Sequence, residues 1–104
     1  MANQEALACQ LTAMSPAERE NYEGLKERLR SSVKEVQELP GGYALRFDAE
    51  PSLILAAAEF ITLESRCCPF YTFHMEVTEN SGPMWLCITG PEEATSFIKD
   101  ALGL

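Results

Sequence analysis

The residues best suited to chemistry lie in one short stretch, Glu64 to Phe70, with the sequence ESRCCPF. Its adjacent cysteines, Cys67 and Cys68, could chelate a thiophilic ion such as Hg(II), As(III), Cu(I) or Zn(II), because thiolate sulfur is a soft ligand. Glu64 precedes the pair by three and four residues and therefore shares a helical face with it. Two sulfurs do not complete a site, since structural zinc takes four ligands. The stretch predicts a soft-ion site that needs further ligands.

Three more side chains are candidate ligands for such an ion, namely Cys9, Cys87 and His74. If a hairpin turns about residues 80–81, residues whose numbers sum to 161 face each other, and His74 then lies opposite Cys87. Cys9 and Cys87 rank above His74 because thiophilic ions prefer sulfur. The predicted metal ligands are Cys67, Cys68, Cys87, Cys9, His74 and Glu64.

Other interpretations of the cysteine pair stay open. Reduced cysteine behaves as a small hydrophobic residue, so the pair is also consistent with simple packing at a helix end. The negative end of the helix dipole and Glu64 disfavour a low thiol pKa, and hence a nucleophilic cysteine, but they do not disfavour a metal site. A thiol-redox protein that cycles through a Cys67–Cys68 or Cys67–Cys87 disulfide is the remaining hypothesis, since a ring between adjacent residues is strained and easily reduced.

Composition and charge exclude several classes of protein. The chain has 104 residues, of which 46% are hydrophobic and 23% charged, with a net charge of −8. This is ordinary globular usage for one domain, and the negative charge disfavours nucleic acid and anionic membrane surfaces as partners. The chain lacks a phosphate-binding glycine loop and the GxSxG and HExxH motifs, so we predict no catalytic or cofactor-binding residues and favour a protein that is not an enzyme.

The expected compartment is the cytoplasm. The N-terminus has no basic segment followed by an apolar one, and no apolar run approaches the roughly 20 residues of a membrane span. The four cysteines contain no CxxC spacing. In a reducing compartment we expect all four to be thiols, without structural disulfides.

Element patterns predict an N-terminal arm over residues 1–14 and a single α+β domain over residues 15–104. A capping box at Ser15 and Glu18 starts a helix over 16–38, and a second helix starts at Pro51 and ends between residues 66 and 68, before Pro69. Alternating residues predict strands over 43–47, 71–78 and 84–89, and a last helix starts near residue 91. The expected order is α-β-α-β-β-α.

The expected sheet has three strands, with helices mainly on one face. A right-handed crossover makes strands 43–47 and 71–78 parallel, so that strand 84–89 fits between them. The face away from the helices would carry Arg46, His74, Glu76, Trp85, Cys87 and Thr89. An apolar patch around Trp85 on that face predicts a homodimer. The expected core contains Leu25, Leu29, Leu45, Phe47, Ile54, Ile61, Met75, Val77, Leu86, Ile88, Phe97 and Ile98.

Three segments together resemble a family: Cys9 to Thr12 (CQLT), then ESRCCPF after an intervening helix, then Thr89 to Pro91 (TGP). They are similar to a group of short bacterial proteins that share a C-x-L-T start and an E-x-R-C-C-P-F segment. The likeness spans most of the chain. It implies a small cytoplasmic bacterial protein and adds Cys9 to the residues of interest, but implies no particular substrate or cofactor.

We therefore expect a small thiol-containing protein that binds a soft metal or metalloid ion through Cys67 and Cys68. The alternatives are a dimeric interaction module with structural cysteines and a thiol-redox protein.

Overall fold

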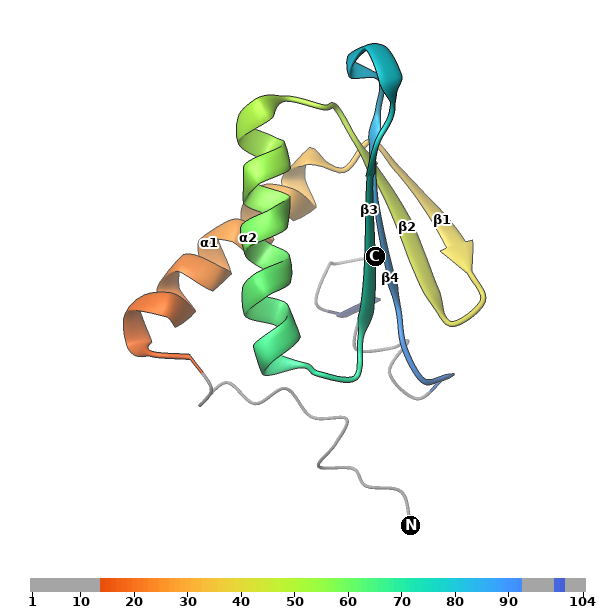
Figure 1. Ribbon diagram of the computed structural model, residues 1–104. Coiled ribbons are helices and arrows are strands. Elements are labelled where there is room, and N and C mark those ends of the chain that lie inside the picture. Colours follow the sequence, from red (N-terminus) through yellow and green to blue (C-terminus); the bar gives the residue numbers. More distant parts are fainter. Residues whose placement is uncertain (1–13, 93–98, 101–104) are drawn as a thin grey trace.

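The computed structural model describes residues 14–92 and 99–100. These residues form a small α+β domain with two long helices and a sheet (Figure 1). The elements in chain order are α1 (Pro16–Ser32), β1 (Glu35–Leu39), β2 (Gly42–Phe47), α2 (Pro51–Cys67), β3 (Thr72–Val77), a short 3-10 helix (Glu79–Ser81) and β4 (Met84–Thr89).

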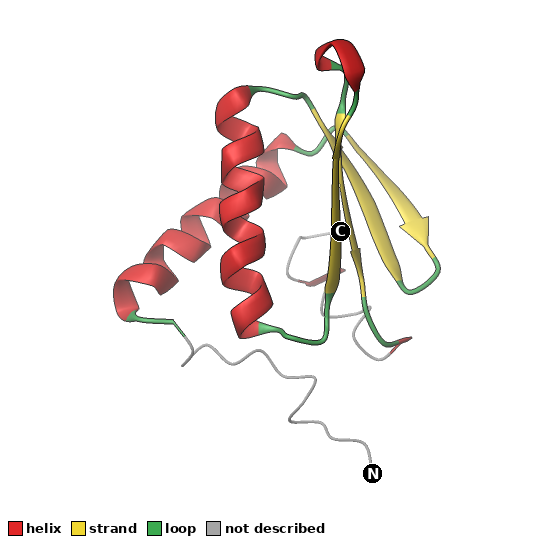
Figure 2. Cartoon of the chain, viewed as in Figure 1, coloured by secondary structure: helices red, strands yellow, loops and turns green. Residues whose placement is uncertain are grey.

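Within the described residues, four strands form one sheet in the order β1-β2-β4-β3, and every neighbouring pair is antiparallel. Since β2 and β3 both run antiparallel to β4, they are parallel to each other, and α2 connects them. This matches the expected arrangement, in which a helix connects two parallel strands and strand 84–89 lies between them. Both α1 and α2 lie on the same side of the sheet (Figure 2).

The expected helix over residues 16–38 is wrong over residues 33–38. The expected three-stranded sheet and the order α-β-α-β-β-α are also wrong, because an additional strand follows α1. The α1 helix ends at Ser32, and the backbone of Val33 is already extended. The following residues form β1, which makes a hairpin with β2 through a tight turn where Gly41 has a φ of +83°. β1 is an edge strand, and its side chains are mostly exposed and polar. The same residue pattern also occurs on the exposed face of a helix, which is why the sequence predicted a longer helix.

Both helix starts and the end of α2 are confirmed. The Ser15 hydroxyl accepts a hydrogen bond from the Glu18 backbone N–H at 3.1 Å, and the Ser15 N–H donates to the Glu18 carboxylate at 2.9 Å. Pro51 occupies the first turn of α2, where its missing N–H costs nothing. The last residue of α2 is Cys67, two residues before Pro69.

The core lies between the two helices and the sheet. Of the expected core residues, six are buried: Leu25, Leu29, Leu45, Phe47, Leu86 and Ile88. Three pack partly buried against them: Ile54, Ile61 and Met75. Val77 is a wrong prediction, because it lies at the end of edge strand β3 and is 45% exposed.

Some predictions fall outside the described residues. These are the arm, apart from Met14, the core positions Phe97 and Ile98, and most of the last helix. Met14 is buried in the core. Neither helix in the described part of the chain is both long enough and apolar enough to span a bilayer.

Candidate functional site

The two adjacent cysteines lie at the C-terminal end of α2. Cys67 is the last helical residue and Cys68 is the C-cap, and both side chains are 0% exposed. The backbone N–H of Cys68 donates to the Glu64 carbonyl at 2.7 Å, which closes the last turn of the helix. This turn brings the two sulfurs into contact, with their Sγ atoms 3.7 Å apart.

The cysteines differ in covalent state. Cys68 is disulfide-bonded, while Cys67 and Cys87 carry thiols. The bond of Cys68 is not to Cys67, because 3.7 Å far exceeds the S–S bond length of about 2.05 Å. The expectation that all cysteines are thiols is therefore wrong for Cys68. Cys9 lies outside the described residues.

A buried carboxylate accompanies the cysteine pair. Glu64 is 4% exposed, and its Oε1 atom has no hydrogen-bond partner among the described residues. Burial raises the pKa of Glu64 because the charged form loses its hydration; a hydrogen bond with Tyr22 and the positive charge of Lys26 oppose this shift. Glu64 therefore holds its proton to higher pH than an exposed glutamate.

Two tyrosines complete the surroundings of this carboxylate. The pKa of Tyr22 and that of Tyr71 are both raised, first by burial and then by the negative charges of Glu64 and Cys67. Both phenols therefore stay protonated at neutral pH. Tyr22, Glu64, Cys67 and the partly buried Tyr71 are ionisable side chains close to the disulfide-bonded Cys68, and these five residues are hereafter the thiol cluster.

Aromatic packing holds these tyrosines in place. The Tyr22 ring stacks on Phe60 of α2 with centroids 5.8 Å apart, and Lys26 Nζ lies 5.4 Å from the centre of the same ring. Tyr71 contacts Phe73 edge-on, with centroids 6.1 Å apart. The cluster is thus built from α1, the end of α2 and the segment that leads into β3.

Arg66 does not balance the charge of Glu64. Its guanidinium pairs with Glu18 at 2.9 Å and so ties the end of α2 to the start of α1. The pKa of Glu18 is lowered, first by the backbone hydrogen bond from Ser15 and then by the hydrogen bond from Arg66. The positive charge that acts on Glu64 is instead that of Lys26.

His74 and Cys87 lie on the other side of the sheet. The expected register is confirmed, since His74 pairs with Cys87 and Glu76 with Trp85. Strand alternation points these residues away from the core that contains Cys67 and Cys68. Within residues 14–92 and 99–100, no three histidine, cysteine or acidic side chains come together as a metal site.

The thiol of Cys87 has its own environment. Burial, and then the negative charge of Glu76, raise the pKa of Cys87. A raised thiol pKa leaves less of the nucleophilic thiolate at neutral pH. Cys87 is therefore a suitable control for the reactivity of Cys67.

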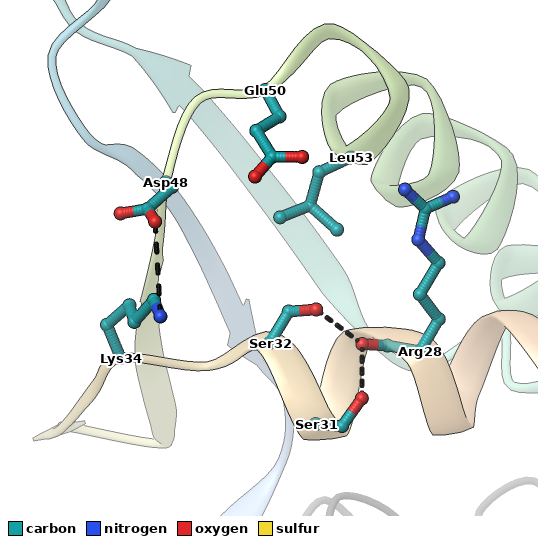
Figure 3. A pocket seen from close by; sticks show the side chains of 7 residues that line it. All are labelled: Arg28, Ser31, Ser32, Lys34, Asp48, Glu50 and Leu53. Atoms are coloured by element: carbon teal, nitrogen blue, oxygen red, sulfur yellow. Dashed lines mark hydrogen bonds and ion pairs between the residues drawn. The ribbon is translucent and has the colours of Figure 1, made fainter.

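A polar pocket lies at the opposite end of α2 (Figure 3). Its volume is about 170 Å³, and it is lined by Arg28, Ser31, Ser32, Lys34, Asp48, Glu50 and Leu53. Lys34 Nζ lies 3.9 Å from an Asp48 oxygen, and Arg28 donates to the Ser52 hydroxyl at 2.8 Å. Since the two basic side chains are balanced by two carboxylates, the pocket has no excess charge to attract an ionic ligand.

Comparison with known proteins does not identify the chain. No family model, curated protein or solved structure matches it. The resemblance to short bacterial proteins with an E-x-R-C-C-P-F segment therefore stays a prediction.

Sequence reasoning identified Glu64, Cys67 and Cys68 but missed Tyr22 and Tyr71. One signal was present. Glu64 follows Phe60 by four residues and Ala57 by seven, so a charged residue occupies the apolar stripe of α2. A carboxylate at such a position must be buried, and its neighbours must include polar groups.

Proposed function

We propose that this protein carries out thiol–disulfide exchange, with Cys67 and Cys68 as the reacting pair. The observation that carries the proposal is the 3.7 Å contact between Cys67 Sγ and the disulfide-bonded Cys68 Sγ. Exchange proceeds when a thiolate attacks a disulfide sulfur. The contact is close to the roughly 3–3.5 Å at which reacting atoms are poised.

The exchange step balances without an outside oxidant. Cys67 gives up its proton, and its sulfur attacks Cys68 Sγ to form a Cys67–Cys68 bond. The original disulfide between Cys68 and its partner sulfur breaks, and that partner sulfur leaves as a thiolate that takes up a proton. One disulfide replaces another, so no electrons are gained or lost.

The product disulfide is suited to transfer rather than to stabilisation. Neighbouring Cα atoms are about 3.8 Å apart across a trans peptide, whereas disulfides usually span about 4.4–6.8 Å. A bond between Cys67 and Cys68 is therefore strained, and a dithiol reductant opens it readily. The protein would pass through this state between two less strained ones.

The soft-ion hypothesis has less support. It needs Cys68 as a thiolate, and the sheet separates His74 and Cys87 from the vicinal pair. It is tested by titrating Zn(II) and As(III) into fully reduced protein and into the Cys67→Ser/Cys68→Ser double variant. Tight binding by the first protein alone, with unchanged exchange chemistry in the Cys67→Ser variant, would favour ion binding over exchange.

The direct test follows the cysteines through redox buffers. Wild-type protein is equilibrated in graded ratios of reduced and oxidised glutathione, quenched in acid, alkylated and analysed by peptide mass spectrometry. We expect the disulfide content at Cys67 and Cys68 to change with the ratio while Cys87 stays alkylated throughout. Because the Cys67 thiol is lost, the Cys67→Ser variant should resolve the glutathione mixed disulfide at Cys68 more slowly than wild type, since only the original partner sulfur of Cys68 can then attack it.

The controls separate exchange from a structural disulfide. A Cys87→Ser variant should behave as wild type, since this residue lies across the sheet from the pair. A Cys67→Ala variant repeats the test without a buried hydroxyl. If Cys68 stays oxidised in every buffer, or if both Cys67 variants resolve the mixed disulfide at the wild-type rate, the exchange function is wrong.

A further inference from the structure

Glu64 is the one buried acidic side chain among the described residues, and packing does not account for it. The neighbouring positions on the same stripe of α2 are apolar, and an unpartnered carboxylate oxygen in the core costs free energy that an apolar residue would not. A buried, incompletely bonded carboxylate beside a thiol therefore calls for a chemical explanation.

We propose that Glu64 is the proton acceptor for the Cys67 thiol, a role that rests on the exchange function proposed above. The two residues are three positions apart on α2 and so share one face of its last turn. Both are buried, and both lie close enough to Tyr22 and Tyr71 to act on each of these phenols through their charge. The carboxylate and the thiol thus lie on one buried face of the last turn of α2.

The proton is conserved through the step. When Cys67 sulfur attacks Cys68, the thiol proton passes to the Glu64 carboxylate, whose Oε1 has no hydrogen-bond partner among the described residues and so can accept it. Glu64 then gives this proton to the sulfur that leaves Cys68. The single negative charge passes from the Glu64 carboxylate to the Cys67 sulfur, then to the leaving sulfur, and returns to Glu64, so a carboxylate and a thiolate are never charged together in the core.

Burial improves Glu64 as a base for this task. An ordinary glutamate is a weak base for a thiol, because its pKa of 4.5 is far below the thiol pKa of about 8.5. Burial raises the pKa of Glu64 and so reduces the difference between the thiol pKa and the carboxyl pKa. Each unit of reduction makes the equilibrium constant for proton transfer from the thiol to the carboxylate about tenfold larger.

The other charged groups near Glu64 modulate this pair. From α1, Lys26 favours the carboxylate and Glu23 disfavours it, while Tyr22 donates a hydrogen bond to it. Tyr71, from the segment that leads into β3, keeps its own proton.

The test measures how fast iodoacetamide alkylates Cys67 between pH 5 and pH 10, with peptide mass spectrometry to assign the adduct. Three proteins are compared: wild type, Glu64→Gln, and the matched control Glu59→Gln. Glu59 lies on the same helix but is exposed, where it accepts a hydrogen bond from Asn21 at 2.6 Å. General-base assistance is typically worth about 10²–10⁴-fold.

We expect Glu64→Gln to react at least tenfold more slowly than wild type at pH 7 and to approach the wild-type rate near pH 10, where hydroxide removes the thiol proton. The control should follow wild type at every pH. A change in local opening alone would shift the rate equally at all pH values, so the shape of the profile isolates the proton transfer. Profiles of the same shape for wild type and Glu64→Gln would overturn the assignment.

The result is separable from the exchange proposal. If glutathione exchange at Cys68 does not occur but alkylation of Cys67 still depends on Glu64, the function is wrong and the acceptor stands. If exchange occurs with the same pH profile in Glu64→Gln as in wild type, the acceptor is wrong and the function stands.

Discussion

Replacing Ile88 by alanine tests the assignment of the sheet face most directly. Ile88 is 3% exposed near the C-terminal end of β4, between Tyr43 of β2 and Phe73 of β3. The change removes three buried carbons, which at about 0.8 kcal/mol each is roughly 2.4 kcal/mol of transfer free energy. The cavity left between three strands adds to this, so we expect a loss of about 3–4 kcal/mol, within the usual range for such substitutions.

The free energy of unfolding is measured by urea titration, with Trp85 fluorescence and far-UV circular dichroism as separate probes. A loss of this size lowers the melting temperature by roughly 12–30 °C in a domain of this length. Val77→Ala is the matched control, because Val77 is 45% exposed on an edge strand and should cost little. A loss below about 1 kcal/mol for Ile88→Ala would refute the packing argument, since it lies beneath the range for filled core sites.

Three further predictions concern the backbone, the buried carboxylate and the open sheet face. An added Cβ at Gly42 would lie 1.8 Å from the Ile88 carbonyl oxygen, so the Gly42→Ala variant should unfold at a markedly lower urea concentration than wild type. Gly24 lies on α1 with open space around it, so Gly24→Ala should raise the free energy of unfolding by about 0.5–1 kcal/mol. The pKa of Glu64 is raised in the folded protein above its ordinary value of 4.5, so the folded state binds this proton more tightly than the unfolded state. The free energy of unfolding therefore falls as the pH rises from 4.5 to the raised pKa of the folded state. The stability of Glu64→Gln relative to wild type should therefore increase with pH from about 4.5 upward in parallel urea titrations, and a constant difference would contradict this. The homodimer expected from the sequence should appear by light scattering at high micromolar concentration with Trp85 shielded from water, and a monomer with water-exposed emission would contradict it.

The parts of the fold that local sequence determines were predictable. The capping box at Ser15, the proline at the start of α2 and the proline after its end each define a boundary through backbone chemistry alone. The hairpin register followed from one turn, because alternation then fixes every pair between β3 and β4.

The first strand was not predictable in the same way. Residues 33–39 carry two valines at helical spacing among charged residues, and only the pairing of β1 with β2 decides against a helix. Strand propensity depends on such tertiary context. The Pro40-Gly41 turn stops a helix as well as it connects two strands, so the same letters fit both structures.

The site was half predictable for a related reason. Glu64, Cys67 and Cys68 are neighbours in sequence, and their shared helical face follows from spacing. Tyr22 comes from another helix, and its approach to Glu64 depends on how α1 packs against α2. The bonded state of Cys68 also involves a sulfur other than that of its neighbour, which no local spacing shows.

The central position of β4 has a consequence for how the chain is made. A ribosome releases β2 and β3 before β4, so each of these strands waits with an unpaired edge until residues 84–89 emerge and insert between them. Cys67 and Cys68 also emerge before β4, which supplies part of the core that covers them. During synthesis their sulfurs are therefore open to the thiols and oxidants of the surrounding solution.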